Sequence, residues 1–367
     1  MSVAARTEVA VERLDVAAYE IPTDEPESDG TLEWDSTTIV VVEAHAGNET
    51  GLGYTYGPAA AGKLVEELLA GEVEGADALA PDKTWERLVR ALRNAGRPGI
   101  GSMALAAVDT ALWDLKARLL GLPLVDVLPR AHDSVPVYGS GGFCSYSLDR
   151  LQEQLAGWVE AGIPRVKMKI SREPERDPER LDAARAAIGD DVELYVDSNG
   201  ALGRNEALAW AHRLRSEWNV TWFEEPVPSA DLDGLRLLCR RGPAGLDIAA
   251  GEYGYVLADF QNLLGSVSCL QADVTRCGGI TGLLQAAGLS GGHGIDVSAH
   301  CAPQLSAHAF CAVPTLRHLE YFHDHVRVEW LLFDGVLGPV DGELRPDRSR
   351  PGHGLALRHA DARDFAV

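Results

Sequence analysis

Seven ionisable side chains that could move a proton or bind a cation recur along the chain at nearly constant intervals. They are Lys169, Asp197, Glu224, Glu252, Asp273, His300 and Glu320, separated by 28, 27, 28, 21, 27 and 20 residues. Each closes a short apolar run, which is the pattern that repeated strand–helix units produce. In a barrel of parallel strands, the carboxyl ends of the strands meet around one mouth, where active sites are built. The spacing therefore predicts both where the chemistry occurs and which fold carries it.

Three of these residues, Asp197, Glu224 and Glu252, fall at three consecutive expected strand ends. Hard oxygen ligands from separate rigid strands suit Mg2+ and leave positions for water and a bidentate substrate. The alternative is three unrelated surface acids, but each follows apolar residues at the same position in its unit. Side chains alternate along a strand, so we expect only one of Glu224 and Glu225 to point inward.

Lys167 and Lys169 lie two residues apart in the run VKMKI, so they share one face of a strand, inside the barrel or on an exposed edge. A second cation and a metal nearby are expected to lower the pKa of a lysine here, which suits it to act as a base. Asp273 and His300 end two later strands, where the carboxylate would fix the tautomer of the imidazole. Four other histidines lack such a partner and are interpreted as structural or exposed: His293, His308, His318 and His323.

Four further residues near the expected mouth are candidates with competing interpretations. Glu320 ends the eighth expected strand and, if it is kept protonated, would donate a hydrogen bond to a developing oxyanion. Asn199 and Ser140 follow strands and could contact substrate hydroxyls, although loop capping explains them equally well. Cys301 directly follows His300, so a nucleophilic role is open. A buried, reduced thiol is the simpler interpretation, as for the other five cysteines, whose spacing matches no zinc motif.

The elements that must hold these residues fall into three predicted parts. We expect a capping domain over residues 1–125, a catalytic barrel over 126–330, and a tail over 331–367 that returns to the capping domain. From Val135 onward the pattern is strand then helix, with eight strands that are almost continuously apolar. Such strands are typical of a parallel sheet covered by helices.

The capping domain is predicted to be an α+β module. Residues 8–22 alternate like a strand, 23–36 form an acidic loop, 37–57 form a hairpin that turns at Gly47–Asn48, and 61–120 are largely helical. The acidic loop and the segment around Tyr54 and Tyr56 are expected to close over the mouth and set specificity. Trp34, in that loop, would stack on a sugar face unless it belongs to the core.

Composition excludes several classes of partner. The net charge of −22 and the pI of about 4.8 disfavour nucleic-acid binding, because phosphate contacts need a basic surface. The sequence contains no run of ~18 apolar residues, so no membrane-spanning helix is predicted. The first residues, MSVAARTEVAVERLD, carry acids early and lack the apolar centre of a secretory signal, so a cytoplasmic protein is expected.

The motifs KMK, DSN, FEEP, GE, Asp273 before RCGG, SAH and HLE together make the chain resemble the enolase superfamily, mandelate racemase subgroup, over nearly its whole length. The resemblance implies a (β/α)7β-type modified TIM barrel, of class α/β, with an N-terminal α+β capping domain completed by the C-terminal tail. It implies one Mg2+ per subunit held by Asp197, Glu224 and Glu252, since the first acid of the FEEP pair is the ligand in that family. It also implies a homo-oligomer.

The resemblance also implies a reaction, the abstraction of a proton alpha to a carboxylate to give an ene-diolate. Lys169 would be the base on one face of a small carboxylate substrate, with Lys167 helping to neutralise that carboxylate. His300, oriented by Asp273, would act on the other face, and Glu320 would donate a hydrogen bond to a carboxylate oxygen.

Several fates of the intermediate fit this set of residues. Dehydration of an acid sugar to a 2-keto-3-deoxy acid is favoured, because His300 could protonate a departing hydroxyl. Racemisation or epimerisation of a 2-hydroxy acid or amino-acid derivative, and cycloisomerisation of a sugar lactone, are the alternatives. A barrel that serves only binding or regulation is a further alternative, although every member of the constellation is present. The acidic loop 23–36 favours a mono-acid over a diacid.

Overall fold

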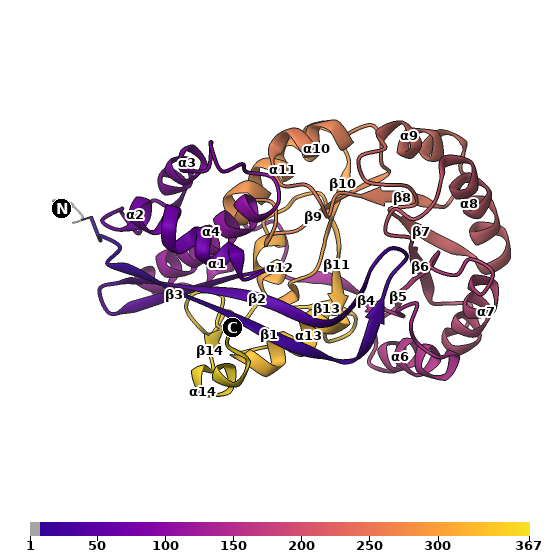
Figure 1. The fold of residues 1–367 in the computed structure, drawn as a ribbon, viewed down its shortest axis with the longest axis horizontal. Helices are drawn as coiled ribbons and strands as arrows, with labels where there is room; N and C mark the ends of the chain where they lie inside the picture. The colour runs from indigo at the N-terminus through magenta and orange to yellow at the C-terminus, as the bar shows by residue number, and fades with distance from the viewer. Residues whose placement is uncertain (1–7) are drawn as a thin grey trace.

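The computed structural model describes residues 8–367, which form an N-terminal cap beside a barrel (Figure 1). The cap begins with an antiparallel sheet of β1 (Arg13–Ser28), β2 (Glu33–Ala46) and β3 (Glu49–Tyr56). Its helical part comprises α1 (Ala60–Leu64), the π-helical turn Val65–Leu69, α2 (Ala70–Val73), α3 (Pro81–Ala91), α4 (Ile100–Leu120) and α5 (Leu124–Val127). Helix α4 packs so closely on β3 that a Cβ at position 53 would collide with the carbonyl oxygen of Ala107, which explains the glycine there.

The acidic segment 23–36 is not a loop, so that prediction was wrong. β1 continues to Ser28 and β2 starts at Glu33, and the two strands pair Glu27 with Trp34 after a register shift that follows Pro22. Acid-rich sequence suggested a loop, but here the acids make local contacts: the carboxylate of Asp29 accepts from the backbone N–H groups of Thr31 and Leu32 at 2.6 and 2.7 Å and closes the turn. The hairpin between β2 and β3 is confirmed, and its turn lies at Gly47–Asn48.

Eight parallel strands close into the predicted barrel. They are β4 (Val135–Gly141), β5 (Arg165–Lys169), β6 (Glu193–Asp197), β7 (Val220–Glu224), β8 (Asp247–Ala250), β9 (Cys269–Ala272), β10 (Asp296–Ala299) and β11 (Leu316–Phe322), and β11 pairs back to β4. Tyr138, Tyr195, Trp222, Ala249 and Cys269 form a compact cluster of their own. Strand alternation places these residues on the inner face, so the barrel is a packed core rather than a pore.

A helix follows every barrel strand and covers the outside of the sheet (Figure 1). These helices are α6 (Leu148–Glu160), α7 (Asp177–Ile188), α8 (Arg204–Trp218), α9 (Leu232–Arg241), α10 (Leu257–Leu263), α11 (Gly279–His293), α12 (Pro303–Phe310) and α13 (His323–Leu332). In residues 8–367 no helix combines the length and the low polarity needed to cross a membrane.

The last residues contact both the barrel and the cap. They form β12 (Phe333–Asp334), β13 (Glu343–Leu344), β14 (Ala356–Leu357), α14 (His359–Ala362) and the turn Arg363–Phe365. β13 pairs with β4 of the barrel, and the backbone N–H of Val367 donates to the carbonyl of Ala18 in β1 at 3.1 Å. The division into domains at residues 125 and 330 stays a prediction.

Asp114 joins three segments of the cap and tail. It is fully buried in α4, and its carboxylate accepts from the backbone N–H groups of Leu52 at 2.8 Å and His353 at 2.7 Å. Arg118, one turn later in α4, pairs with it at 2.6 Å. A single buried charge thus links α4, β3 and the C-terminal tail.

We expect Asp114→Ala to lower the free energy of unfolding by about 3 kcal/mol, because it leaves two buried N–H groups and one guanidinium without their partner. Urea denaturation followed by far-UV circular dichroism measures the loss. Asp133→Ala is the matched control, since Asp133 also pairs with an arginine, Arg130, but its side chain is 78% exposed. An equal effect of the two variants would contradict the role of Asp114.

Candidate active site

The strand register brings three of the predicted residues side by side at the barrel mouth. Lys169, Asp197 and Glu224 are the last residues of β5, β6 and β7, and the pairing places Lys169 opposite Asp197 and Asp197 opposite Glu224. Trp222 lies two residues before Glu224, on the same face of β7, and its indole N–H donates to the Glu224 carboxylate at 2.9 Å. The mouth is therefore built on rigid strands with fixed neighbours.

Glu252 joins this group from the turn after β8. The turn depends on Gly251, whose φ of +141° disfavours other residues and whose missing Cβ leaves room for the backbone of Gln271. Asp197, Glu224 and Glu252 are buried, and each offers a carboxylate oxygen within 4.8 Å of the others. Three convergent carboxylates in this range fit one divalent cation with oxygen ligands.

Lys167 lies beneath the mouth with no exposed surface. Its ammonium donates to Glu224 and Asp197 and lies 2.8 Å from a carboxylate oxygen of Glu320. Burial disfavours the charged form, but Glu224 and then Glu320 outweigh burial and raise the pKa of Lys167 well above its ordinary value. Lys167 is therefore a permanent cation that holds carboxylates from different strands together.

Lys169 lies next to Asp197, and this contact favours the protonated form of the lysine. Its ammonium donates to Asp197 at 2.5 Å. Burial lowers its pKa, but the Asp197 carboxylate dominates and raises the pKa above its ordinary value. The lowered pKa was predicted for a lysine beside a bound metal ion and stays a prediction, because here the whole charge of Asp197 is directed at the lysine.

His300 and Asp273 form the expected pair. His300 directly follows β10, and Asp273 directly follows β9. His300 Nδ1 lies 2.8 Å from one carboxylate oxygen of Asp273. The other oxygen of Asp273 accepts hydrogen bonds from the backbone N–H and the hydroxyl of Thr275, both at 2.7 Å. On the other side of the ring, Nε2 lies 3.2 Å from Glu252 and 3.5 Å from Glu320. Burial lowers the pKa of His300, but the surrounding anionic groups raise it well above its ordinary value. The ring can therefore hold a proton on Nε2 at the mouth.

Glu320 lies within β11 rather than at its end and is charged. Its carboxylate accepts from the hydroxyl of Ser140 at 2.6 Å and pairs with Lys167. Burial raises its pKa, but Lys167 and then His300 lower it below the ordinary value. In this arrangement its oxygens accept hydrogen bonds, and the donor role of a protonated Glu320 stays a prediction.

A cavity of about 470 Å³ lies above these groups, and the β1–β2 hairpin forms part of its wall. Figure 1 shows this hairpin reaching across to the barrel, and His323 of α13 pairs with Asp24 of the hairpin at 3.0 Å. Lys169, Glu252, His300 and Glu320 all line the cavity. Both candidate bases, Glu320 and one of the three candidate cation ligands therefore face one space beside the cap.

The four predicted substrate-binding residues divide into two pairs. Trp34 and Asn199 line the cavity, and the indole N–H of Trp34 donates to Glu27 at 2.9 Å, which leaves the ring as its contact surface. Tyr56 and Ser140 do not line it. Tyr56 is buried with its ring stacked on His325, and Ser140 is buried behind Glu320, so both predictions of direct contact were wrong.

Four residues of the site were missed or set aside in the sequence. Glu225 is buried as well as Glu224, because β7 ends at Glu224 and a φ of +36° at Glu225 breaks the strand alternation. Arg276, three residues after Asp273, contacts Glu252 at 3.4 Å, and its spacing from Asp273 could have identified it. His325 lines the cavity without any sequence signal.

Cys301, the fourth of these, is a buried thiol that lines the cavity. Its sulfur lies 3.4 Å from His300 Nε2 and donates to Glu320 at 3.4 Å. Burial and then the Glu320 charge raise the pKa of Cys301 above its ordinary value, so the group stays protonated. A protonated thiol does not support nucleophilic chemistry.

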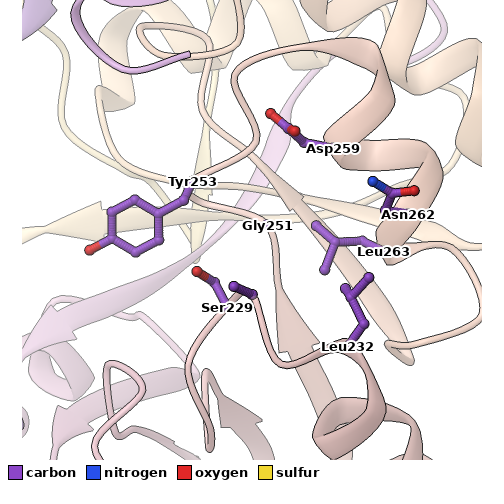
Figure 2. Close-up of a pocket in the computed structure, with 8 residues that line it drawn as sticks. Ser229, Leu232, Gly251, Tyr253, Asp259, Asn262 and Leu263 are labelled. Atoms are coloured by element: carbon purple, nitrogen blue, oxygen red, sulfur yellow. The ribbon is translucent and has the colours of Figure 1, made fainter.

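A second cavity of about 320 Å³ adjoins the first (Figure 2). Figure 2 shows Tyr253 on one side of it, across from Leu232, Asn262 and Leu263. Tyr253 also lines the first cavity, so its ring is a wall common to both. None of the seven spaced residues lines the second cavity, whereas four of them line the first.

Comparison with known proteins agrees with this geometry. Residues 15–129 match the N-terminal domain of the mandelate racemase/muconate lactonizing enzymes, and residues 150–362 match the enolase C-terminal domain-like family. The chain therefore belongs to the mandelate racemase/muconate lactonizing enzyme family of the enolase superfamily.

Individual relatives cover most of the chain. The 3,6-anhydro-alpha-L-galactonate cycloisomerase of Streptomyces coelicolor is 31% identical over 95% of this chain and 97% of its own length. The L-talarate/galactarate dehydratase of Salmonella typhimurium is 34% identical over 80% of this chain and 74% of its own length. A mandelate racemase/muconate lactonizing enzyme-like protein from Rubrobacter xylanophilus has a crystal structure with a TM-score of 0.97 and 63% identity, covering 98% of this chain and 100% of that one.

A relative of known structure binds magnesium, the cofactor that the sequence predicts. A racemase from Streptomyces coelicolor crystallised with bound magnesium has a TM-score of 0.91 and 31% identity, over 97% of this chain and 100% of that one. The residues present here fit the ion, because the mouth gathers more buried carboxylates than cations. Burial and the charges of Glu252 and Asp197 raise the pKa of Glu225 well above its ordinary value, and one of its oxygens has no hydrogen-bond partner. A divalent cation would offset this negative excess.

We expect Asp197→Asn to weaken Mg2+ binding by about 10-fold or more, because it removes one of three charged oxygen ligands without changing side-chain volume. Isothermal titration calorimetry with MgCl2 measures the affinity. Glu193→Gln is the matched control, since Glu193 begins the same strand and pairs with Arg165 away from the mouth. Unchanged affinity in Asp197→Asn would contradict this assignment of the ligand set.

Proposed function

We propose that this enzyme dehydrates an acid sugar to a 2-keto-3-deoxy acid, starting with removal of the proton alpha to the carboxylate. The observation that carries the proposal is one cavity lined by Lys169 and His300, which reach it from strands β5 and β10 on different sides of the barrel. The strands that bear Asp197 and Glu224 lie directly beside β5. A substrate carboxylate near these acids would have a proton-transfer group on each side.

The residues of the chain divide the reaction between them. When bound, Mg2+ neutralises Asp197 and the charge that develops on the substrate carboxylate, which lowers the pKa of Lys169 and stabilises the ene-diolate. Lys169 takes the alpha proton. His300, held by Asp273, gives its Nε2 proton to the hydroxyl on the beta carbon as the C–O bond breaks. Water leaves, and the enol so formed becomes the 2-keto-3-deoxy acid.

The charges around the cavity favour a mono-acid substrate over a diacid. Two strong cations line the cavity, Lys169 and Arg276, and both are already paired with carboxylates of the site. The hairpin adds Asp29 and Glu33 to the wall and no cation. A second substrate carboxylate would meet negative charge, whereas hydroxyl groups could hydrogen-bond to these acids.

Cycloisomerisation is the second candidate, because the cycloisomerase from Streptomyces coelicolor aligns with 95% of this chain. That reaction would start with the same step, removal of a proton alpha to a carbonyl group. The two candidates differ in the product.

We expect wild-type enzyme with Mg2+ to exchange the alpha proton of at least one C5 or C6 aldonic acid with deuterium in D2O, followed by NMR. Semicarbazide-reactive product would select dehydration, and ring-opened or ring-closed isomers would select cycloisomerisation. Stereoisomer formation without a keto product would select epimerisation. Absence of exchange across a panel of aldonic acids and lactones would overturn the proposal.

We expect Lys169→Ala and His300→Ala each to reduce exchange by about 10²- to 10⁴-fold, on opposite epimers of the acid, because each removes one proton-transfer group. Exchange rates on the two epimers, compared by NMR, measure the effect. Lys63→Ala is the control, since Lys63 is a solvent-exposed lysine of α1. Loss on the same epimer in both variants would contradict the two-sided arrangement.

A further inference from the structure

His325, the third residue of α13, lies in the cavity wall where the cap meets the barrel. It is 6% exposed and lines the cavity together with His300, Cys301 and Glu320. Its ring stacks on Tyr56 of the cap with 3.4 Å between ring centroids, and Phe322 packs edge-on at 5.1 Å. Aromatic neighbours on two sides therefore fix the plane of the imidazole.

The tautomer of His325 follows from one hydrogen bond. The backbone N–H of Ala302 donates to Nδ1 at 3.3 Å. A backbone N–H cannot accept, so Nδ1 is the acceptor and the ring proton lies on Nε2. Burial lowers the pKa of His325 to about 3 although the nearby Asp273 raises it, so the ring is neutral at physiological pH.

Nε2 of His325 is available to a ligand. Among residues 8–367 no side chain or backbone group accepts a hydrogen bond from it, and it is not one of the buried polar atoms shut off from solvent. The neighbouring polar groups are already engaged: His300 with Asp273, and the Cys301 thiol with Glu320. Nε2 of His325 is thus a neutral N–H donor of fixed direction at the cavity wall, beside groups that already have partners.

We propose that His325 is a specificity-determining residue whose Nε2–H donates a hydrogen bond to a hydroxyl oxygen of the bound acid. The inference rests on the proposed function for its substrate class and deepens it. A neutral donor recognises a hydroxyl without adding charge, and an acid that lacks this hydroxyl would leave the donor unpaired. The competing interpretation is positioning alone, in which Nδ1 holds the N–H of Ala302 and so the strained turn at Cys301 and Ala302, where φ is +50° and +44°.

Two substitutions separate the nitrogens. In His325→Gln the amide nitrogen can replace Nε2, and in His325→Asn the amide oxygen can replace Nδ1 while the donor falls short of the cavity. If the inference is correct, His325→Gln keeps kcat/KM within about 3-fold and His325→Asn loses about 10-fold or more. A larger loss of kcat/KM in His325→Gln than in His325→Asn would show positioning through Ala302 and overturn the inference. Unchanged kcat/KM in both variants would also overturn it.

Deoxy analogues locate the recognised hydroxyl. The aldonic acid that wild-type enzyme uses best is compared with its monodeoxy derivatives, each lacking one hydroxyl beyond the reacting carbons. The loss caused by His325→Asn should vanish for one derivative and persist for the others. An equal loss on every derivative would overturn the role of His325 while leaving the proposed function intact.

The tautomer is tested without activity. In full-length enzyme labelled with 15N-histidine, the 15N shifts of His325, assigned with His325→Gln, should report a neutral ring protonated on Nε2 between pH 6 and 8. A ring protonated on Nδ1, or titration within this range, would overturn the inference even if no acid were turned over. Thermal unfolding of both variants identifies any that do not fold.

Discussion

The ammonium of Lys167 lies inside the barrel among carboxylates from three other strands, and the site depends on this interaction. Removing one partner from such a buried group would leave uncompensated charge, which is strongly unfavourable. Because Asp197, Glu224 and Glu320 reach the ammonium from β6, β7 and β11, they can meet it only when the barrel is closed and in register. The same contact thus supports the fold and sets the positions of two of the proposed Mg2+ ligands.

Electrostatics explain how a few side chains can serve several roles at this mouth. Lys167 lowers the pKa of Glu320, while burial and the charges of Glu252 and Asp197 raise the pKa of Glu225. Lys169 contacts Asp197, so its basicity depends on where the charge of Asp197 is directed. Because these groups are coupled, a bound Mg2+ would change the pKa of each neighbouring group and so take part in the proposed proton transfer.

The cap determines what the cavity can accept. Its hairpin brings acids and Trp34 to the cavity wall, and the ring of Tyr56 stacks on His325. The proposed proton-transfer groups come from the barrel strands and the turns after them, whereas the groups proposed to distinguish substrates come from the cap and from α13. This division lets one rigid centre act with different lids, in agreement with relatives that include both dehydratases and cycloisomerases.

The sequence alone determined the order of the elements, the barrel of eight strands and six of the seven spaced residues at or just after strand ends, because period and apolar runs are local properties. It did not reveal that segment 23–36 is paired, that Glu225 is buried or that Tyr56 lies behind His325. Each of these depends on contacts between distant segments, and the raised pKa of Lys169 depends on a carboxylate 28 residues away. Only the tertiary structure decided them, since side-chain neighbours and buried charges are set when the barrel closes and the cap docks on it.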